Sequence, residues 1–248
     1  MTGPGPLVSI CFQVGEIPPS IPLHLLGIVT VQSTSSAAEG QLLWPLLASF
    51  VCGSIPFAWL IGKSRGIDLL KVGSGNPGAT NLSRELGKPY GLLGLSLDVM
   101  KGAMPILWFS SFPPGTLLLI GAASVVGHCF SPFLRGRGGK GVATTGGVLL
   151  ALEPVIALVM LSSWFVTFKA IQSVGMASVM AALTGILLAL CLLLGWDPLV
   201  SVLRTADEGL RFPSMLGVVL LTLSMLVLIR HRSNIKEYWD SRREEESR

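Results

Sequence analysis

The chain has 248 residues, of which 50% are hydrophobic and only 13% are charged, and its mean hydropathy is +0.67. A soluble domain carries about 25% charged residues, so this composition excludes an ordinary soluble domain and indicates that the lipid bilayer is the solvent. We attribute the net charge of +4 to loops that face anionic lipid and anionic substrates, and we expect no nucleic-acid partner.

Residues 1–40 differ from the rest of the chain, because they hold five prolines and no lysine or arginine. A signal peptide begins with basic residues, and the apolar stretch 21–31 is too short to cross a bilayer by itself. We predict that 1–40 is a poorly ordered or interfacial extension on the outer side of the membrane.

Apolar stretches long enough to cross the bilayer follow from residue 42 onward. The stretch 141–168 is too long for one span of roughly 20 residues and holds Glu153 and Pro154 in its middle. Because proline interrupts helical hydrogen bonding and restricts the residue before it, we predict two short helices there. The predicted spans are 42–62, 90–110, 115–131, 138–152, 154–168, 175–195 and 213–230.

The placement of lysine and arginine predicts the orientation of these spans. With the N-terminus outside, fourteen of the 18 basic residues fall in inner segments, and only Arg204 and Arg211 fall in outer loops. The predicted inner segments are 63–89, 132–140, 169–174 and 231–248. The sequence thus predicts an all-α, polytopic integral membrane protein with seven transmembrane helices, its N-terminus outside and its C-terminus inside. Residues 41–236 would form this single domain, and 237–248 a charged cytoplasmic tail.

The first polar constellation leads out of the first span. Gly53-Ser54-Ile55-Pro56-Phe57 interrupts the apolar stretch, and the inner loop reads Gly73-Ser74-Gly75-Asn76-Pro77-Gly78-Ala79-Thr80-Asn81 before Arg84 and Lys88. Glycines let backbone amides approach an anion, and the asparagine and serine side chains add neutral donors. A short helix opening near Pro77 would direct its N-terminus at the same anion. We predict an anion site here, rather than a flexible linker.

The second constellation precedes the helix predicted after 138. It reads Arg135-Gly136-Arg137-Gly138-Gly139-Lys140-Gly141-Val142-Ala143-Thr144. Its glycines, lysine and following helix are typical of a phosphate site. The spacing is not that of a nucleotide-binding loop, because Val142 stands where that loop needs a hydroxyl. We predict a phosphate or acyl-phosphate site.

The third constellation, Arg230-His231-Arg232-Ser233-Asn234-Ile235-Lys236, closes the last span. A cluster of basic residues that ends the span at the inner face, as the positive-inside rule describes, accounts for its arginines. It does not account for His231 and Asn234, which lie three apart and therefore on one helical face. We predict that both belong to the site.

Three further predictions concern residues outside these constellations. Asp98 and Lys101 lie at i and i+3, so we predict a structural ion pair that lines the site. Ser173 begins a span at the inner side and could donate to a phosphate. The tryptophans and phenylalanines near span ends are interpreted as interface anchors. No spacing indicates a catalytic metal, and no histidine has an aspartate five residues later.

These motifs, in this order, resemble the acyl-phosphate-dependent glycerol-3-phosphate acyltransferases of bacteria, the PlsY type. The resemblance covers about residues 42–236 and depends on GSIPF at 53–57, GSGNPGATN at 73–81, LDVMKG at 97–102, GH at 127–128, GRGGKGVAT at 136–144 and RHRSNI at 230–235. It implies a seven-span enzyme without a cofactor in the bacterial inner membrane, with its site facing the cytoplasm. Its substrates would be glycerol 3-phosphate and a long-chain acyl-phosphate, and its product lysophosphatidic acid.

Residue by residue, the resemblance and the motifs give a set of expected roles. The expected catalytic residues are Ser74, Asn76, Lys140 and His231. The expected substrate-binding residues are Ser54, Gly75, Arg84, Lys88, Gly138, Gly139, Gly141, Thr144, Ser173 and Asn234. A second serine of the family pattern stands here as Met176.

Two other functions compete with this one. A transporter or flippase for a phosphorylated small molecule would place its site near the midplane, which only Asp98 and Lys101 favour. A non-catalytic scaffold would leave three donor-rich motifs unexplained. Within the enzyme class, the sequence leaves open whether the acyl donor is acyl-CoA.

Overall fold

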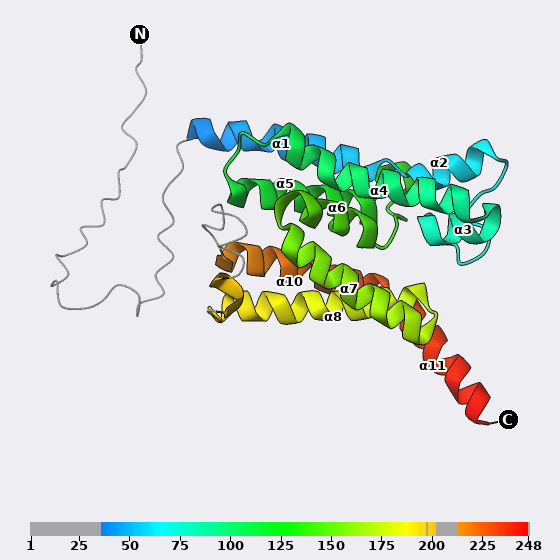
Figure 1. The fold of residues 1–248 in the computed structure, drawn as a ribbon. Helices are drawn as coiled ribbons and strands as arrows, with labels where there is room; N and C mark the ends of the chain where they lie inside the picture. The colour runs from blue at the N-terminus through cyan, green and yellow to red at the C-terminus, as the bar shows by residue number, and fades with distance from the viewer. Residues whose placement is uncertain (1–35, 197, 202–212, 248) are drawn as a thin grey trace, which may run out of the picture.

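The computed structural model of the protein describes residues 36–196, 198–201 and 213–247, and its elements in those ranges are helices (Figure 1). The predicted extension up to residue 35, together with Arg204 and Arg211, lies outside the described residues. The helices are α1 (Ser36–Ser54), α2 (Phe57–Ser64), α3 (Ala79–Leu86), α4 (Lys88–Trp108), α5 (Pro114–Cys129), α6 (Val142–Leu152), α7 (Pro154–Ile171), α8 (Val174–Leu193), α10 (Pro213–Arg230) and α11 (Arg232–Glu246), with a 3₁₀ turn at Pro132–Leu134.

Five stretches of the described chain are long and apolar enough to cross a membrane, and all five coincide with predicted spans. They are Leu42–Ser64, Pro114–Leu134, Pro154–Ile171, Val174–Leu193 and Pro213–Arg230. The other two predicted spans correspond to α4, which carries Asp98 and Lys101, and to α6, which has only 11 residues. The count of seven spans therefore stays a prediction.

The predicted break of the 141–168 stretch is confirmed. Helix α6 ends at Leu152 and α7 begins at Pro154, with Glu153 in a non-helical conformation between them. Proline suits the first position of a helix, because its missing N–H would have no partner there.

The predicted span 42–62 is confirmed, but it is not one unbroken helix. Helix α1 begins at Ser36, six residues earlier, and the helix breaks at Ile55 and Pro56 before α2 starts. The Lys101 ammonium donates to the Ile55 carbonyl over 2.8 Å, so a side chain from α4 satisfies backbone at the break.

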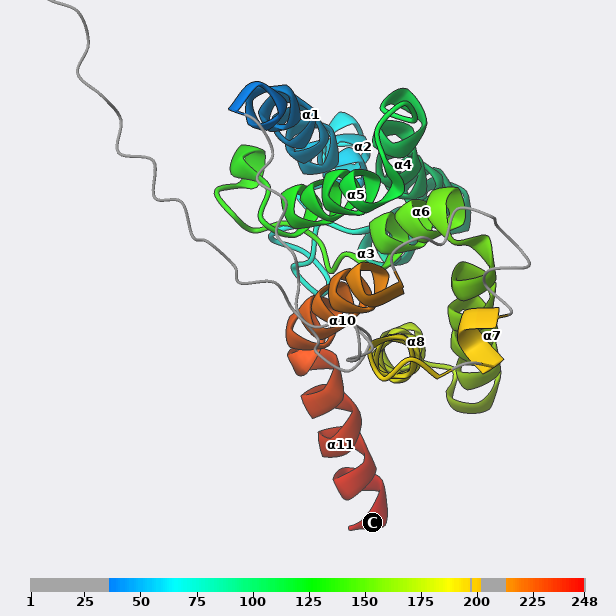
Figure 2. The same ribbon diagram turned by 90° about the vertical axis from the view of Figure 1, so that its left-hand side faces the viewer.

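The helices pack through small residues. Helix α5 lies along α1, α6 lies along α4, and α7 and α10 flank α8 (Figure 2). At the α4–α6 contact, a Cβ on Gly102 would lie 2.2 Å from the Thr144 carbonyl oxygen, and one on Gly147 would lie 2.0 Å from that of Val99. Backbones approach this closely only where glycine stands on one side.

The polar segments gather at one end of the bundle, where α2, α3 and the start of α11 lie (Figure 1). The C-terminal ends of α5, α7 and α10 and the N-terminal ends of α6 and α8 meet there. Each of the three polar constellations is therefore carried to the same end, although they are far apart in the sequence.

Candidate active site

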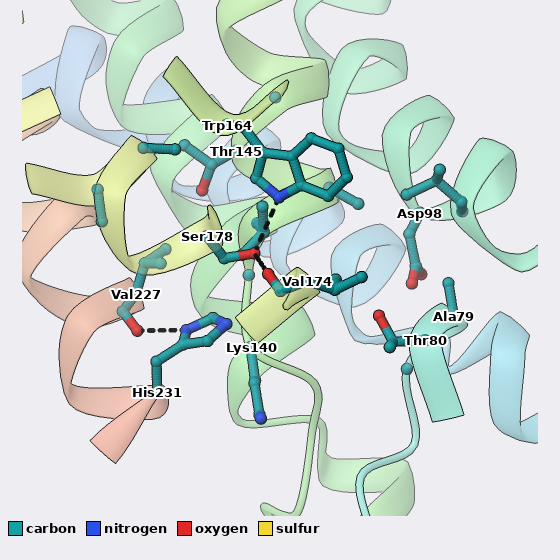
Figure 3. Close-up of a pocket in the computed structure, with 18 of the residues that line it drawn as sticks. Ala79, Thr80, Asp98, Lys140, Thr145, Trp164, Val174, Ser178, Val227 and His231 are labelled. Carbon is teal, nitrogen blue, oxygen red and sulfur yellow. Dashed lines mark hydrogen bonds between the residues drawn. The ribbon is translucent and has the colours of Figure 1, made fainter. Parts of the chain in front are cut away.

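A cavity of about 420 Å³ opens among α3, α4, α6, α7, α8 and α10. Its polar part is lined by Ser74, Asn76, Thr80, Arg84, Asp98, His128, Lys140, His231 and Asn234. Its apolar part is lined by Leu149, Leu150, Ala157, Met160, Leu161, Trp164, Ala181 and Ala182. One continuous space thus joins a cluster of hydrogen-bond donors to an apolar channel between helices (Figure 3).

The loop before α3 is held in shape by Asn81, which is buried. Its side-chain amide donates to the carbonyls of Leu69 and Val72, both over 3.1 Å, and its oxygen accepts from the Ser74 N–H over 3.0 Å. Gly73 has φ +57° and lies so close that a Cβ there would be 2.3 Å from the Asn81 oxygen. Asn81 therefore sets the course of the loop that places Ser74 on the cavity wall.

Helix α3 begins at Ala79, as the short helix predicted after Pro77 requires. Its first turn brings Thr80 to the cavity, and its last turn carries Arg84. The Arg84 side chain is exposed at the mouth, so its guanidinium can meet an anion arriving from water.

Lys140 lies just before α6 and lines the cavity. Its ammonium donates to the side-chain oxygen of Asn234, in the first turn of α11. Burial lowers the pKa of Lys140 below its usual value; the charge of Glu237 opposes this, and Arg84 and Arg230 add to it. A phosphate dianion would relieve this concentration of positive charge.

His231 lies at the junction of α10 and α11 and is buried. Its Nδ1 is 2.8 Å from the Val227 carbonyl oxygen, which can only accept, so Nδ1 carries the proton and Nε2 is left as an acceptor (Figure 3). Burial lowers the pKa of His231 to about 4. The hydrogen bond with the Val227 carbonyl opposes this shift, and the positive charges of Lys140 and Arg230 add to it. The imidazole is therefore neutral at pH 7.

The predicted ion pair of Asp98 and Lys101 is confirmed, with 2.8 Å between the ammonium and the carboxylate. Both side chains are buried, and Asp98 lines the cavity. His128 also lines the cavity, and its Nδ1 lies 3.7 Å from the Asp98 carboxylate. From the sequence alone, a single histidine at this position would be interpreted as structural.

Of the fourteen expected site residues, the structure brings seven together on the cavity wall. They are Ser74, Asn76, Arg84, Lys140, Gly141, His231 and Asn234. The other seven do not line it: Ser54, Gly75, Lys88, Gly138, Gly139, Thr144 and Ser173.

For four of these seven residues the structure shows where the side chain lies instead. The Ser54 hydroxyl donates to the Phe50 carbonyl over 2.7 Å inside α1. The Ser173 hydroxyl caps α8 by accepting from the Met176 N–H over 3.3 Å. Lys88 begins α4 as an exposed residue. Thr144 is buried where α6 meets α4, so its neighbour Thr145 faces the cavity instead.

The glycines of the second constellation also shape the loop and hold it to α5. The Gly139 N–H donates to the His128 carbonyl over 3.0 Å, so that amide is occupied within the protein. Gly141 has φ +86° and turns the chain into α6. The Gly139 N–H is therefore not free for a substrate anion, while the expected substrate-binding roles of Gly138 and Gly141 stay predictions.

The sequence analysis missed part of the wall. Trp164 lines the cavity: its indole N–H donates to the Ser178 hydroxyl over 3.2 Å, and that hydroxyl donates to the Val174 carbonyl over 2.9 Å (Figure 3). Thr145 is the second threonine of a pair, and nothing in the local pattern distinguishes it from Thr144. Within the described ranges, no three His, Cys, Asp or Glu side chains form a group that could hold a metal ion.

The fold and the cavity define a multi-pass membrane protein in which one cavity joins polar and charged side chains to an apolar wall. The sequence model of the family described as glycerol-3-phosphate acyltransferase matches residues 43–241. The chain therefore belongs to the glycerol-3-phosphate acyltransferase family and is a membrane acyltransferase, which confirms the resemblance drawn from its motifs.

Individual relatives agree over most of the chain. A glycerol-3-phosphate acyltransferase of Endomicrobium trichonymphae is 34% identical over 195 residues, which are 77% of this chain and 88% of the relative. The enzyme of Aquifex aeolicus is 36% identical over 198 residues, 79% of this chain and 94% of its own. A crystal structure of PlsY, an integral membrane glycerol 3-phosphate acyltransferase, in its glycerol 3-phosphate form matches with a TM-score of 0.69 and 35% identity, covering 82% of this chain and 94% of that one.

Proposed function

We propose that this protein transfers a fatty acyl group from acyl-phosphate to the 1-hydroxyl of glycerol 3-phosphate, giving lysophosphatidic acid and phosphate. The observation that carries the proposal is the cavity that joins Arg84, Lys140, His231 and Asn234 to an apolar channel walled by α6, α7 and α8. Two solved PlsY structures, in a glycerol 3-phosphate form and a lysophosphatidic acid form, match the fold at 35% and 33% identity.

The acceptor binds at the polar end. Arg84 provides a planar fork for the phosphate of glycerol 3-phosphate, and Asn234 provides neutral hydrogen bonds. The neutral His231, with its proton on Nδ1, offers Nε2 as an acceptor for a hydroxyl of the glycerol. A charged imidazole would have no acceptor left, so its lowered pKa suits this role.

The donor places its phosphate at Lys140 and its acyl chain in the apolar channel. Each methylene transferred from water into the channel contributes about 0.8 kcal/mol. Ser74 and Asn76, on the loop that Asn81 orders, lie on the same wall and bridge the two substrates.

The reaction needs no enzymic nucleophile, because an acyl-phosphate is a mixed anhydride and already activated. The 1-hydroxyl oxygen attacks the acyl carbonyl carbon, the bond from that carbon to the phosphate oxygen breaks, and inorganic phosphate leaves. The hydroxyl proton passes to a phosphate group of the substrates. The protein aligns the reactants and neutralises the two phosphates.

We further propose that the protein lies in the bacterial inner membrane with seven spans, its N-terminus outside and its site facing the cytoplasm. The basic residues of the inner segments favour this orientation. A single cysteine placed at Ser241 in α11, in a variant whose four native cysteines are replaced by alanine, tests it. An impermeant maleimide should label that variant in inverted vesicles and not in intact cells. Labelling in intact cells would reverse the orientation.

The function is tested with purified protein in lipid, labelled glycerol 3-phosphate and either palmitoyl phosphate or palmitoyl-CoA. Lysophosphatidic acid formed only with the phosphate supports the proposal. Product only with the thioester would overturn the donor, and no product with either, from folded protein, would favour the transporter.

A further inference from the structure

The last residue of α10, Arg230, is half-buried and contacts the second constellation. Its Nη2 donates to the Gly138 carbonyl oxygen over 2.6 Å and its Nε to the Gly139 carbonyl oxygen over 3.2 Å. The guanidinium also lies 5.7 Å from the centre of the Phe130 ring. The sequence interpretation of this arginine as part of a topology signal does not account for two hydrogen bonds to a loop 91 and 92 positions away.

The opposite side of the same loop is fixed by the end of α5. The Gly139 N–H donates to the His128 carbonyl, and a Cβ on Gly138 would lie 2.0 Å from that oxygen. A Cβ on Gly139 would lie 2.1 Å from Nε2 of His128. The loop is therefore held between His128 and Arg230, with no room for a side chain.

Lys140 follows this fixed segment directly. Its position in the cavity depends on the backbone of Gly138 and Gly139, and its ammonium reaches Asn234 across the mouth. Arg230 is in turn the neighbour of His231, so one arginine connects the backbones that carry two site residues.

We propose that Arg230 is a positioning residue: its guanidinium holds the Gly138 and Gly139 carbonyls, so that Lys140 is placed to bind the donor phosphate. This inference rests on the proposed function of Lys140. The planar fork of arginine matters here, because two carbonyls are held at once and a lysine ammonium is a point charge that cannot reproduce both directions.

The deciding variant is Arg230→Lys, which keeps the positive charge that a topology signal or a general electrostatic role requires. We expect kcat with palmitoyl phosphate to fall by roughly ten- to a hundredfold, as for a small misplacement of a reacting group. We expect the thermal unfolding midpoint in detergent to stay close to that of the wild type. Arg232→Lys is the matched control, since Arg232 is exposed on the same basic segment, and it should leave kcat unchanged.

Chemical rescue provides an independent measurement. In Arg230→Ala, ethylguanidinium should restore turnover, and ethylammonium at the same concentration should not, because only the former has a planar fork. Wild-type turnover by Arg230→Lys, or equal rescue by both cations, overturns the inference. Failure of the proposed function is distinguishable, since it would appear as a wild-type protein that forms no lysophosphatidic acid.

Discussion

Lys140 donates a hydrogen bond to the side-chain oxygen of Asn234, which stands 94 positions later in the chain. This contact joins the loop before α6 to the first turn of α11 across the polar end of the cavity. Asn234 offers only a neutral oxygen to an ammonium whose pKa burial has already lowered. On the proposed function, a substrate phosphate would be a stronger partner for this ammonium than the amide oxygen, because both groups of that bond would be charged.

Replacing Lys140 by alanine should lower kcat/KM for palmitoyl phosphate by at least ten- to a hundredfold, because a hydrogen bond to a charged group contributes roughly 1.5–3 kcal/mol. The measurement is steady-state turnover in lipid. Lys88→Ala is the control: Lys88 is exposed and outside the cavity wall, so activity should stay near that of the wild type. Equal losses of activity in both variants would show that Lys88 also contributes to the site.

The stability of the protein should depend on His231 at acid pH. Its pKa is about 4 in the folded state, below the ordinary value of 6.5, so the unfolded chain binds the proton more readily between these values. The neutral His231 therefore makes its full contribution to the free energy of unfolding above pH 6.5. That contribution is lost as the pH falls toward 4, and the loss reaches roughly 3 kcal/mol. Urea unfolding in detergent at pH 7 and pH 4.5 measures it. His231→Asn should show a smaller loss between those pH values, and an unchanged loss would contradict the assignment.

Two neighbouring glycines of α6 should respond oppositely to alanine. At Gly147 the new Cβ would lie 2.0 Å from the Val99 carbonyl oxygen of α4, whereas at Gly146 nothing lies within 4 Å. We expect Gly147→Ala to force α4 and α6 apart and to lower the unfolding midpoint strongly. Gly146→Ala should be neutral or stabilising, by up to about 1 kcal/mol, because alanine favours the helix. Thermal unfolding of the two variants measures this difference. Equal midpoints would mean that the α4–α6 contact is looser than described.

Gly146 also provides a test of the acyl channel, because it lines the cavity and has open space at its Cβ. A leucine there should project into the channel without displacing protein atoms. We expect Gly146→Leu to reduce turnover of palmitoyl phosphate much more than that of octanoyl phosphate, with Gly146→Ala as the small-side-chain control. An unchanged ratio between the two donors would place the acyl chain elsewhere.

Removal of Lys101 should destabilise the fold, because its ammonium pairs with the buried Asp98 and caps the Ile55 carbonyl. Breaking such a pair costs about 3–5 kcal/mol when one charge is left alone. We expect Lys101→Met to lower the yield and the unfolding midpoint, while the turnover of the remaining folded protein stays within a few-fold of the wild type. Lys101→Met combined with Asp98→Leu should recover part of the stability. Full stability with selective loss of turnover would assign Lys101 to catalysis.

Local patterns in the chain were sufficient for much of this description. The length of 141–168 and Pro154 predict two helices, and the structure has them, because proline acts on its immediate neighbours. The motifs around Asn76, Lys140 and His231 indicate the family, because residue type and order are properties of the chain itself.

The choice of which motif residues face the site belongs to the tertiary structure. Thr144 and Thr145 are adjacent, chemically alike and both buried, and only the packing of α6 against α4 decides that Thr145 and not Thr144 lines the cavity. Ser173 looks like a phosphate donor until its hydroxyl is seen capping α8, and Arg230 looks like a topology signal until its guanidinium is seen on the Gly138 and Gly139 carbonyls. The Ser173 cap is a local bond to Met176, three residues on, and it follows from where α8 begins. The placing of Thr145 and of Arg230 depends on contacts between segments tens of residues apart, which hydropathy and spacing along one segment cannot contain.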